Sequence, residues 1–393
     1  MSNDDFPRGD APLPVEPPAP DATPPAKPAE PDAAFGRGEG VGQALEVEGL
    51  SQGQIVWGRF IRHRGAIFGV VTISLIALLS FSAMGFGPIR GWWQYQDYLA
   101  SNANIENGAA PTLTMPTWLG GPGFAIGNHP FGQDTIGRDN FALVMKGIQT
   151  SLLVMFVLGL VTLLIGVTVG ALAGYYRGWI DTVLMRVTDL VITLPVIVLG
   201  AVLGRLVNTL PVKMNASQEV VDAIRINIPL LLALALGLIL WTGLARLVRS
   251  EFLTLREREF VDSARVSGAS DWRIITKHIL PNAVGVIIVN TTLTMSVAVV
   301  LEAALSFLGF GVKEPNVSLG KLISDYQGAF ATRPWLFWWP GLFIILVALS
   351  INFIGDGLRD AYDPRTKRIP SQRKMDAAAA KAGLAVAQKE AAK

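Results

Sequence analysis

The sequence predicts an all-α, polytopic membrane protein with six membrane-spanning helices and both termini on the cytoplasmic side. Of its 393 residues, 51% are hydrophobic and only 16% are charged, and the mean hydropathy is positive, at +0.41. Several apolar runs approach the roughly 20 residues needed to cross a hydrocarbon layer about 30 Å thick. Lys and Arg are concentrated in alternate connecting segments, which is the pattern that sets orientation in a membrane.

The chain begins with an acidic, proline-rich segment, residues 1–54. Its first 50 residues contain ten prolines, ten acidic residues and three basic residues. Such a composition cannot bury enough apolar surface to offset the entropy of ordering, so we predict a disordered tail. The segment is not a secretory signal peptide, because its first residues are acidic and no apolar stretch begins before residue 66.

Six apolar runs follow the tail. Four are uncharged and have the length of a span, at about 66–87, 148–174, 226–245 and 334–355. The other two, at about 183–204 and 283–308, contain Asp189 and Glu302 respectively. We expect structural or interfacial roles for both acids, since a proton relay would place acids near the midplane with partners. Pro195 is expected to bend the span at 183–204.

The distribution of basic residues orients these spans. The predicted inside segments carry 18 Lys and Arg in 75 residues, at 55–65, 175–186, 246–278 and 356–374. The predicted outside segments carry 9 in 107 residues, at 87–147, 205–225 and 310–334. Both termini are then cytoplasmic. We divide the chain into a first span with an outer segment (55–147), a transmembrane core (148–364) and a basic, alanine-rich tail (365–393).

Glycines in the second span predict close helix packing. Gly159, Gly166, Gly170 and Gly174 are spaced by seven, four and four residues, so they share one helix face. Small residues on one face allow another backbone to approach, as in most packed membrane bundles.

The composition argues against chemistry within this chain. It has no cysteine and only three scattered histidines, His63, His129 and His278, which excludes disulfides and thiol catalysis and disfavours a metal site. No G-x-x-x-x-G-K-[ST] loop is found, nor a G-x-S-x-G or H-E-x-x-H motif. We expect no catalytic residue, cofactor or metal site here, and no nucleic-acid partner.

The cytoplasmic segment 251–282 is expected to fold as two helices. On helical spacing, Leu253, Phe260, Ala264 and Gly268 share an apolar face. Gly268 suits a turn, and Ser270 is a candidate N-cap. The second helix is expected to start with Asp271 in its first turn, to line its apolar side with Trp272, Ile275 and Ile279, and to end at Pro281. From the pattern alone, a connector lying on the lipid headgroups is an equal alternative.

The residues of this segment resemble the signature loop of the membrane subunits of bacterial ABC importers. That pattern is E-A-A, three residues, Gly, nine residues and I-x-L-P; this chain has Asp262-Ser263-Ala264, Gly268 and His278-Ile279-Leu280-Pro281 at those spacings. It departs by Asp for Glu, Ser for Ala and His for Ile. The H-I-L-P-N form is similar to that of the oligopeptide and dipeptide importers, the peptide/nickel family.

Two further stretches are similar to the second, or C-type, permease of that family. One is H-P-F-G-Q-D-T-I-G-R-D at residues 129–139, with Gln133 in place of the usual Thr. The other is E-A-A-L-S-F-L-G-F-G at residues 302–311, followed by L-R-D-A-Y-D-P-R at residues 358–365. The resemblance covers about residues 57–368.

The resemblance implies the type I importer permease fold and a peptide permease that moves its cargo by alternating access in the bacterial cytoplasmic membrane. The implied partners are a second, homologous permease, two cytoplasmic ATPases that bind ATP and Mg²⁺, an extracytoplasmic binding protein and membrane lipid. The loop would sit in a groove on the ATPase. The residues assigned to this coupling are Arg258, Phe260, Asp262, Ala264, Arg265, Gly268, Asp271, His278 and Pro281.

Two other classes of function are alternatives for a chain with several spans. An ion-coupled secondary transporter predicts inverted repeats and paired midplane charges and leaves the cytoplasmic helix pair unexplained. An intramembrane protease needs motifs that this sequence lacks. Oligopeptides and dipeptides are the expected cargo, with nickel chelates, glutathione and peptide-like antibiotics as alternatives, and no substrate-binding residue is assigned. The segment 88–125 is expected to extend against the docked binding protein.

Overall fold

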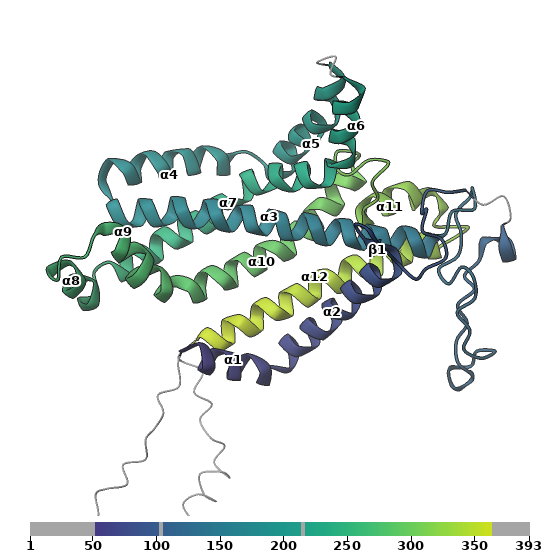
Figure 1. Cartoon of the computed structure of the whole chain (residues 1–393), viewed down its shortest axis with the longest axis horizontal. Coiled ribbons are helices and arrows are strands. Elements are labelled where there is room, and N and C mark those ends of the chain that lie inside the picture. The colour runs from purple at the N-terminus through teal and green to yellow at the C-terminus, as the bar shows by residue number, and fades with distance from the viewer. Residues whose placement is uncertain (1–51, 102–104, 214–216, 364–393) are drawn as a thin grey trace, which may run out of the picture. The chain divides into compact units, whose positions relative to one another are not determined.

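The computed structural model describes residues 52–101, 105–213 and 217–363, so most of the predicted N-terminal tail and all of the C-terminal one lie outside the described residues. The described part is mainly helical (Figure 1), which confirms the all-α prediction. Five unbroken helical stretches within it are long and apolar enough to span a membrane: α2 (Arg64–Met84), α3 (Asn140–Tyr176), α7 (Ile228–Leu255), Asp271–Phe307 and α12 (Trp335–Tyr362).

The predicted span at 183–204 is present as a bent pair of helices, and counting that pair as one span gives six among the described residues. α4 (Gly178–Thr193) and α5 (Val196–Lys213) are separate helices that meet at 86°. Leu194, at the break, has an extended backbone (φ −83°, ψ 130°), as is favoured before a proline. Pro195 also cannot donate a helical hydrogen bond. The bend predicted at Pro195 is therefore confirmed, but it separates two helices instead of curving one.

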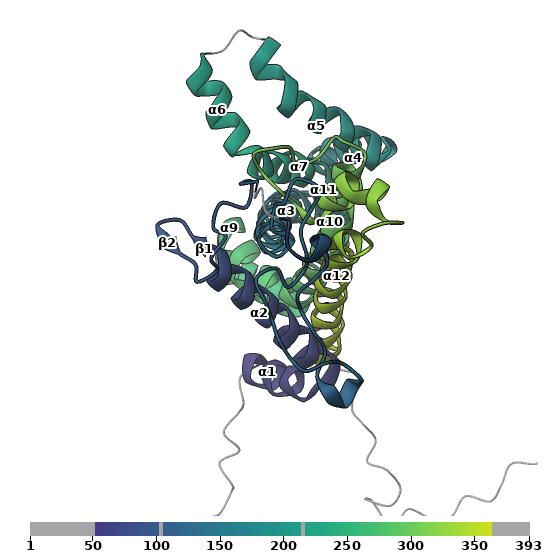
Figure 2. The ribbon, with the colours of Figure 1, turned by 90° about the vertical axis from the view of Figure 1, so that its right-hand side faces the viewer.

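α3 lies at the centre of the helices, as the end-on view shows (Figure 2). Its glycine face packs on α7 as predicted: a Cβ added to Gly170 would lie 2.5 Å from the carbonyl oxygen of Ala245, and one added to Gly174 would lie 2.6 Å from the Cβ of Phe252. Gly166 faces Leu244 of α7, whereas Gly159 faces Met295 of the stretch Asp271–Phe307. The predicted close packing is confirmed.

Shorter elements lie at the two ends of the long helices (Figure 1). At the end predicted to be cytoplasmic are α1 (Gln52–Arg62), α8 (Glu259–Val266) and α9 (Asp271–Arg273). The opposite end carries the antiparallel hairpin of β1 (Gly85–Phe86) and β2 (Ile89–Arg90), 3₁₀ turns at Glu106–Ala109, Thr117–Leu119 and Gln327–Ala329, α6 (Gln218–Ile226) and α11 (Leu319–Tyr326). The segments that the distribution of Lys and Arg assigns to the cytoplasmic side therefore lie at one end of the long helices.

Candidate coupling site

The predicted helix, turn and helix in segment 251–282 are present. α7 ends at Leu255, residues 256–258 form a turn, and α8 follows. That turn interrupts the helical period, so the single apolar face predicted from Leu253 through Gly268 is wrong.

Val261 fixes α8 to the rest of the chain. Its side chain is fully buried in a cluster with Phe252 of α7 and with Ile274 and Ile279, and Ala264 packs half-buried against the same cluster. Burying a side chain of this size stabilises the docked arrangement by about 1.5–3 kcal/mol. α8 is therefore a packed element and not a loose connector.

Gly268 makes the turn between the two short helices, as predicted. Its φ of +79° lies in the left-handed region that favours glycine. The Gly268 N–H donates to the carbonyl of Arg265 (3.0 Å), and the Ala269 N–H donates to the carbonyl of Ala264 (3.1 Å). A Cβ at this position would meet no atom of the chain within 4 Å. Within this chain the requirement for glycine comes from backbone conformation.

The second short helix runs into a membrane-spanning helix without a break. α9, a π-helical segment (Ile274–Ile279) and α10 (Leu280–Phe307) form one helical stretch, so the predicted end at Pro281 is wrong. The Leu280 N–H donates to the carbonyl of Ile275, five residues earlier. This wider turn places Pro281 in the first turn of α10, where the missing N–H is tolerated.

Tyr175, at the end of α3, anchors this element. Its hydroxyl donates to Asp271 Oδ1 (2.6 Å), and the Arg256 guanidinium donates to its backbone carbonyl and lies 5.5 Å from the centre of its ring. Arg177 is paired with Glu257 and holds the pKa of that carboxyl below its usual value. Sequence patterns do not predict these contacts, because the partners are 80 to 96 residues apart.

Three large apolar side chains of this element face away from the chain. Phe260 is 39% exposed, Trp272 71% and Val266 90%. We call these three residues the coupling face. Trp272 was expected on the packed side of the second helix, where only Ile275 and Ile279 are buried; α9 turns the indole outward instead.

The predicted polar residues Arg258, Asp262 and Arg265 lie at the start of α8 or within it. Arg265 pairs with Asp262 one helical turn away (3.0 Å), and both are exposed, so the pair contributes little to stability. Arg258 occupies the N-cap position of α8 without a side-chain capping bond, and Ser270 likewise precedes α9 without one. His278 is half-buried, and its backbone carbonyl accepts a bond from Asn282.

Two ion pairs tie α4 to α7 near this end. Arg249 donates to both carboxyl oxygens of Asp181, at 2.5 and 2.6 Å, and Arg246 donates to Asp189 at 2.6 Å. Asp189 thus has the structural role expected of it. Glu302 has one too: it is almost fully buried and accepts bonds from Ser151 (3.1 Å) and Ser306 (2.7 Å).

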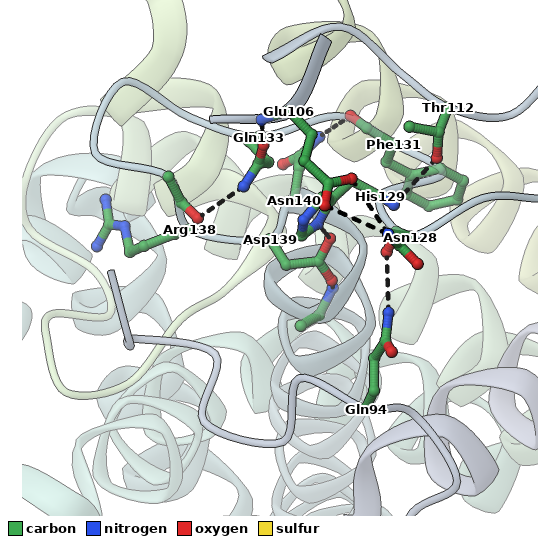
Figure 3. A network of polar contacts seen from close by, with 12 residues as sticks. Gln94, Glu106, Thr112, Asn128, His129, Phe131, Gln133, Arg138, Asp139 and Asn140 are labelled. Carbon is green, nitrogen blue, oxygen red and sulfur yellow. Dashed lines mark hydrogen bonds and ion pairs between the residues drawn. The ribbon is translucent and has the colours of Figure 1, made fainter. Parts of the chain in front are cut away.

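The motif at residues 129–139 organises the opposite end of α3 (Figure 3). Asp139 caps α3 through the Ala142 N–H (2.9 Å) and accepts bonds from His129 Nδ1 (2.8 Å) and Trp93 Nε1 (2.8 Å). Burial raises the pKa of Asp139, and its bond to His129 opposes that rise. Within the described residues no group of three or more His, Asp or Glu is placed to hold a metal ion.

Comparison with known proteins gives two family matches. Residues 166–368 match the model described as the binding-protein-dependent transport system inner membrane component. Residues 51–104 match the N-terminal TM domain of oligopeptide transport permease C.

Similar proteins include permeases from distant bacteria. The oligopeptide transport system permease protein OppC of Mycobacterium tuberculosis is 34% identical over 82% of this chain and 98% of its own length. The dipeptide transport system permease protein DppC of Alkalihalophilus pseudofirmus is 34% identical over 78% and 88%. A solved chain of the MetNI methionine ABC transporter, in an inward-facing conformation, aligns with a TM-score of 0.42 at 24% identity over 57% of this chain and 98% of that one.

Proposed function

Because this chain belongs to the family of binding-protein-dependent transport system inner membrane components, we propose that it is the C-type permease of an ATP-driven importer of oligopeptides or dipeptides in the bacterial cytoplasmic membrane. Membership of this family, and with it the type I importer permease fold, confirms the prediction made from the loop. The runner-up, ion-coupled secondary transport, has no support among the relatives described above.

The observation that carries the coupling proposal is the unbroken helix from Asp271 to Phe307. It has 37 residues and is about 55 Å long. A displacement applied to α9 is passed to α10 with no loop to absorb it. α8 follows the same movement because Val261 packs against Ile274 and Ile279.

The coupling face is the surface proposed to meet the ATPase. Phe260, Val266 and Trp272 are exposed on two short helices that project from the end of the bundle, and exposed apolar groups of this kind mark protein interfaces. Asp262, Arg258 and Arg265 supply a polar rim, which favours specificity over affinity. ATP and Mg²⁺ would bind to the partner ATPases and not to this chain.

The proposal is tested by purifying the complex through this chain and measuring peptide uptake in liposomes. We expect two ATPases, a second permease and an uptake that stops when ATP cannot be hydrolysed. Trp272→Ala should weaken ATPase association about tenfold or more, because a buried aromatic anchor at an interface contributes 2 kcal/mol or more.

Trp179→Ala is the matched control. Trp179 is 75% exposed and lies at the same end of the bundle, in the first turn of α4. It should leave ATPase association unchanged. Equal effects of the two substitutions, or none from Trp272→Ala, would remove the coupling face from the interface while leaving the transport function intact.

A further inference from the structure

Lys146 is the only charged residue within the 37 residues of α3. It lies six positions from the start of that helix, about 9 Å inside it. A charged side chain within a membrane-spanning helix is costly and commonly marks a pathway or a binding site. A lysine near a helix end can also simply extend its ammonium group to the interface, so its surroundings decide between the two.

The surroundings of Lys146 hold its ammonium group without neutralising it. Nζ donates to Gln149 Oε1 at 3.1 Å and lies 5.9 Å from the ring centre of Tyr98. No carboxylate of the described residues lies within ion-pairing distance of it. By contrast, Arg138 and Lys321 at the same end are paired, at 2.7 Å, with Asp134 and Asp325.

Gln149 is itself fixed in orientation. Its Nε2 donates to the backbone carbonyls of Ser80 and Gly85, both at 3.0 Å, and the side chain is buried. The amide oxygen is therefore turned toward Lys146. The bond to this oriented neutral acceptor therefore fixes the position of the Lys146 ammonium group.

A cavity of about 820 Å³ lies in front of Lys146. Lys146, Gln149 and Thr150 line it from α3, and Asn227 and Asn316 add further amides. Phe81, Phe86 and Phe156 supply an apolar wall. The volume is within the roughly 300–1,000 Å³ of pockets for small molecules, and a few polar groups in an apolar wall are typical of such pockets.

We propose that this cavity receives the peptide on its passage and that Lys146 Nζ binds the terminal carboxylate. The proposal rests on the peptide-import function given above and deepens it. An ammonium group and a carboxylate form a charge-assisted hydrogen bond. The amides of Asn227 and Asn316 can bond to peptide groups, and the phenylalanine wall accepts apolar side chains of varied sequence.

The absence of cysteine from this chain allows a direct test. Lys146→Cys would be assembled with its partners, reconstituted in liposomes and supplied with loaded binding protein. We expect uptake of a peptide with a free carboxylate to fall about tenfold, as expected for loss of one charged hydrogen bond. Treatment with 2-aminoethyl methanethiosulfonate, which rebuilds a cationic side chain, should restore most of the uptake, and a neutral reagent of similar size should not.

Lys313→Cys is the matched control, because Lys313 is exposed at the same end and outside the cavity; neither it nor its modification should change uptake. For the amidated form of the same peptide, uptake by the wild type and by Lys146→Cys should differ by less than twofold. Unchanged uptake in Lys146→Cys, or equal rescue by the neutral reagent, would overturn the site. Loss of the second permease on co-purification would instead assign Lys146 to subunit pairing. Failure of the wild-type complex to take up any peptide would overturn the proposed function itself.

Discussion

Replacing Gly170 by Ala tests the close contact between α3 and α7. The new Cβ would lie 2.5 Å from the carbonyl oxygen of Ala245 and 2.7 Å from the Cβ of Val248. Ordinary carbon contacts are about 3.5–4.0 Å, so the helices must separate by roughly 1 Å. Overpacking of this kind costs about 1–3 kcal/mol. The higher helix propensity of Ala returns about 1 kcal/mol.

Gly243→Ala isolates the packing cost. Gly243 lies in α7, is exposed, and has no atom within 4 Å of a Cβ built on it. This variant gains the helix propensity and meets no clash. The two variants should therefore differ by the overpacking cost alone, about 1–3 kcal/mol.

The assay is thermal unfolding of the purified full-length chain in detergent, followed by tryptophan fluorescence. Gly170→Ala should melt about 2–6 °C below Gly243→Ala. A melting temperature for Gly170→Ala equal to or above that of Gly243→Ala would refute the close backbone approach on which the α3–α7 interface is built.

Three further predictions follow from particular contacts. Val261→Asp should lower the melting temperature strongly, because it places a carboxylate in the fully buried cluster under α8. Val266→Asp, at a 90% exposed position, should not lower it, and equal melting temperatures for the two variants would contradict the packing of α8. In unfolding experiments, a double-mutant cycle on Asp181 and Arg249 should give a coupling free energy of about 1–3 kcal/mol. The exposed Asp222–Arg225 pair should give less than about 0.5 kcal/mol, and similar values for the two pairs would show that the Asp181–Arg249 pair does not stabilise the contact between α4 and α7. Asp139→Ala should destabilise the folded chain by roughly 2–5 kcal/mol, since it removes the N-cap of α3 and the acceptor for Trp93, and Asp139→Asn should cost less because Asn also caps a helix. Limited proteolysis of the segment before α3 measures both effects, and equal protease sensitivity of the two variants would contradict the capping role.

Sequence reasoning located the element at 251–282 but not its boundaries. Gly268 was predicted correctly because its requirement is local: only the backbone angle at one residue matters. Trp272 and Pro281 were predicted wrongly because their outcome depends on neighbours. A π-helical turn that the sequence does not announce carries the helix past Pro281, and α9 turns Trp272 away from the core.

The sequence by itself determined the membrane class, the helical character of the spans and the family. Each follows from properties that short segments carry alone: apolar length, glycine spacing and an ordered motif. Only the tertiary structure decided the partners of Asp181 and Asp189 and the cavity in front of Lys146. These arise where helices distant in the chain meet, and the pairing of such surfaces depends on packing geometry that no local pattern records.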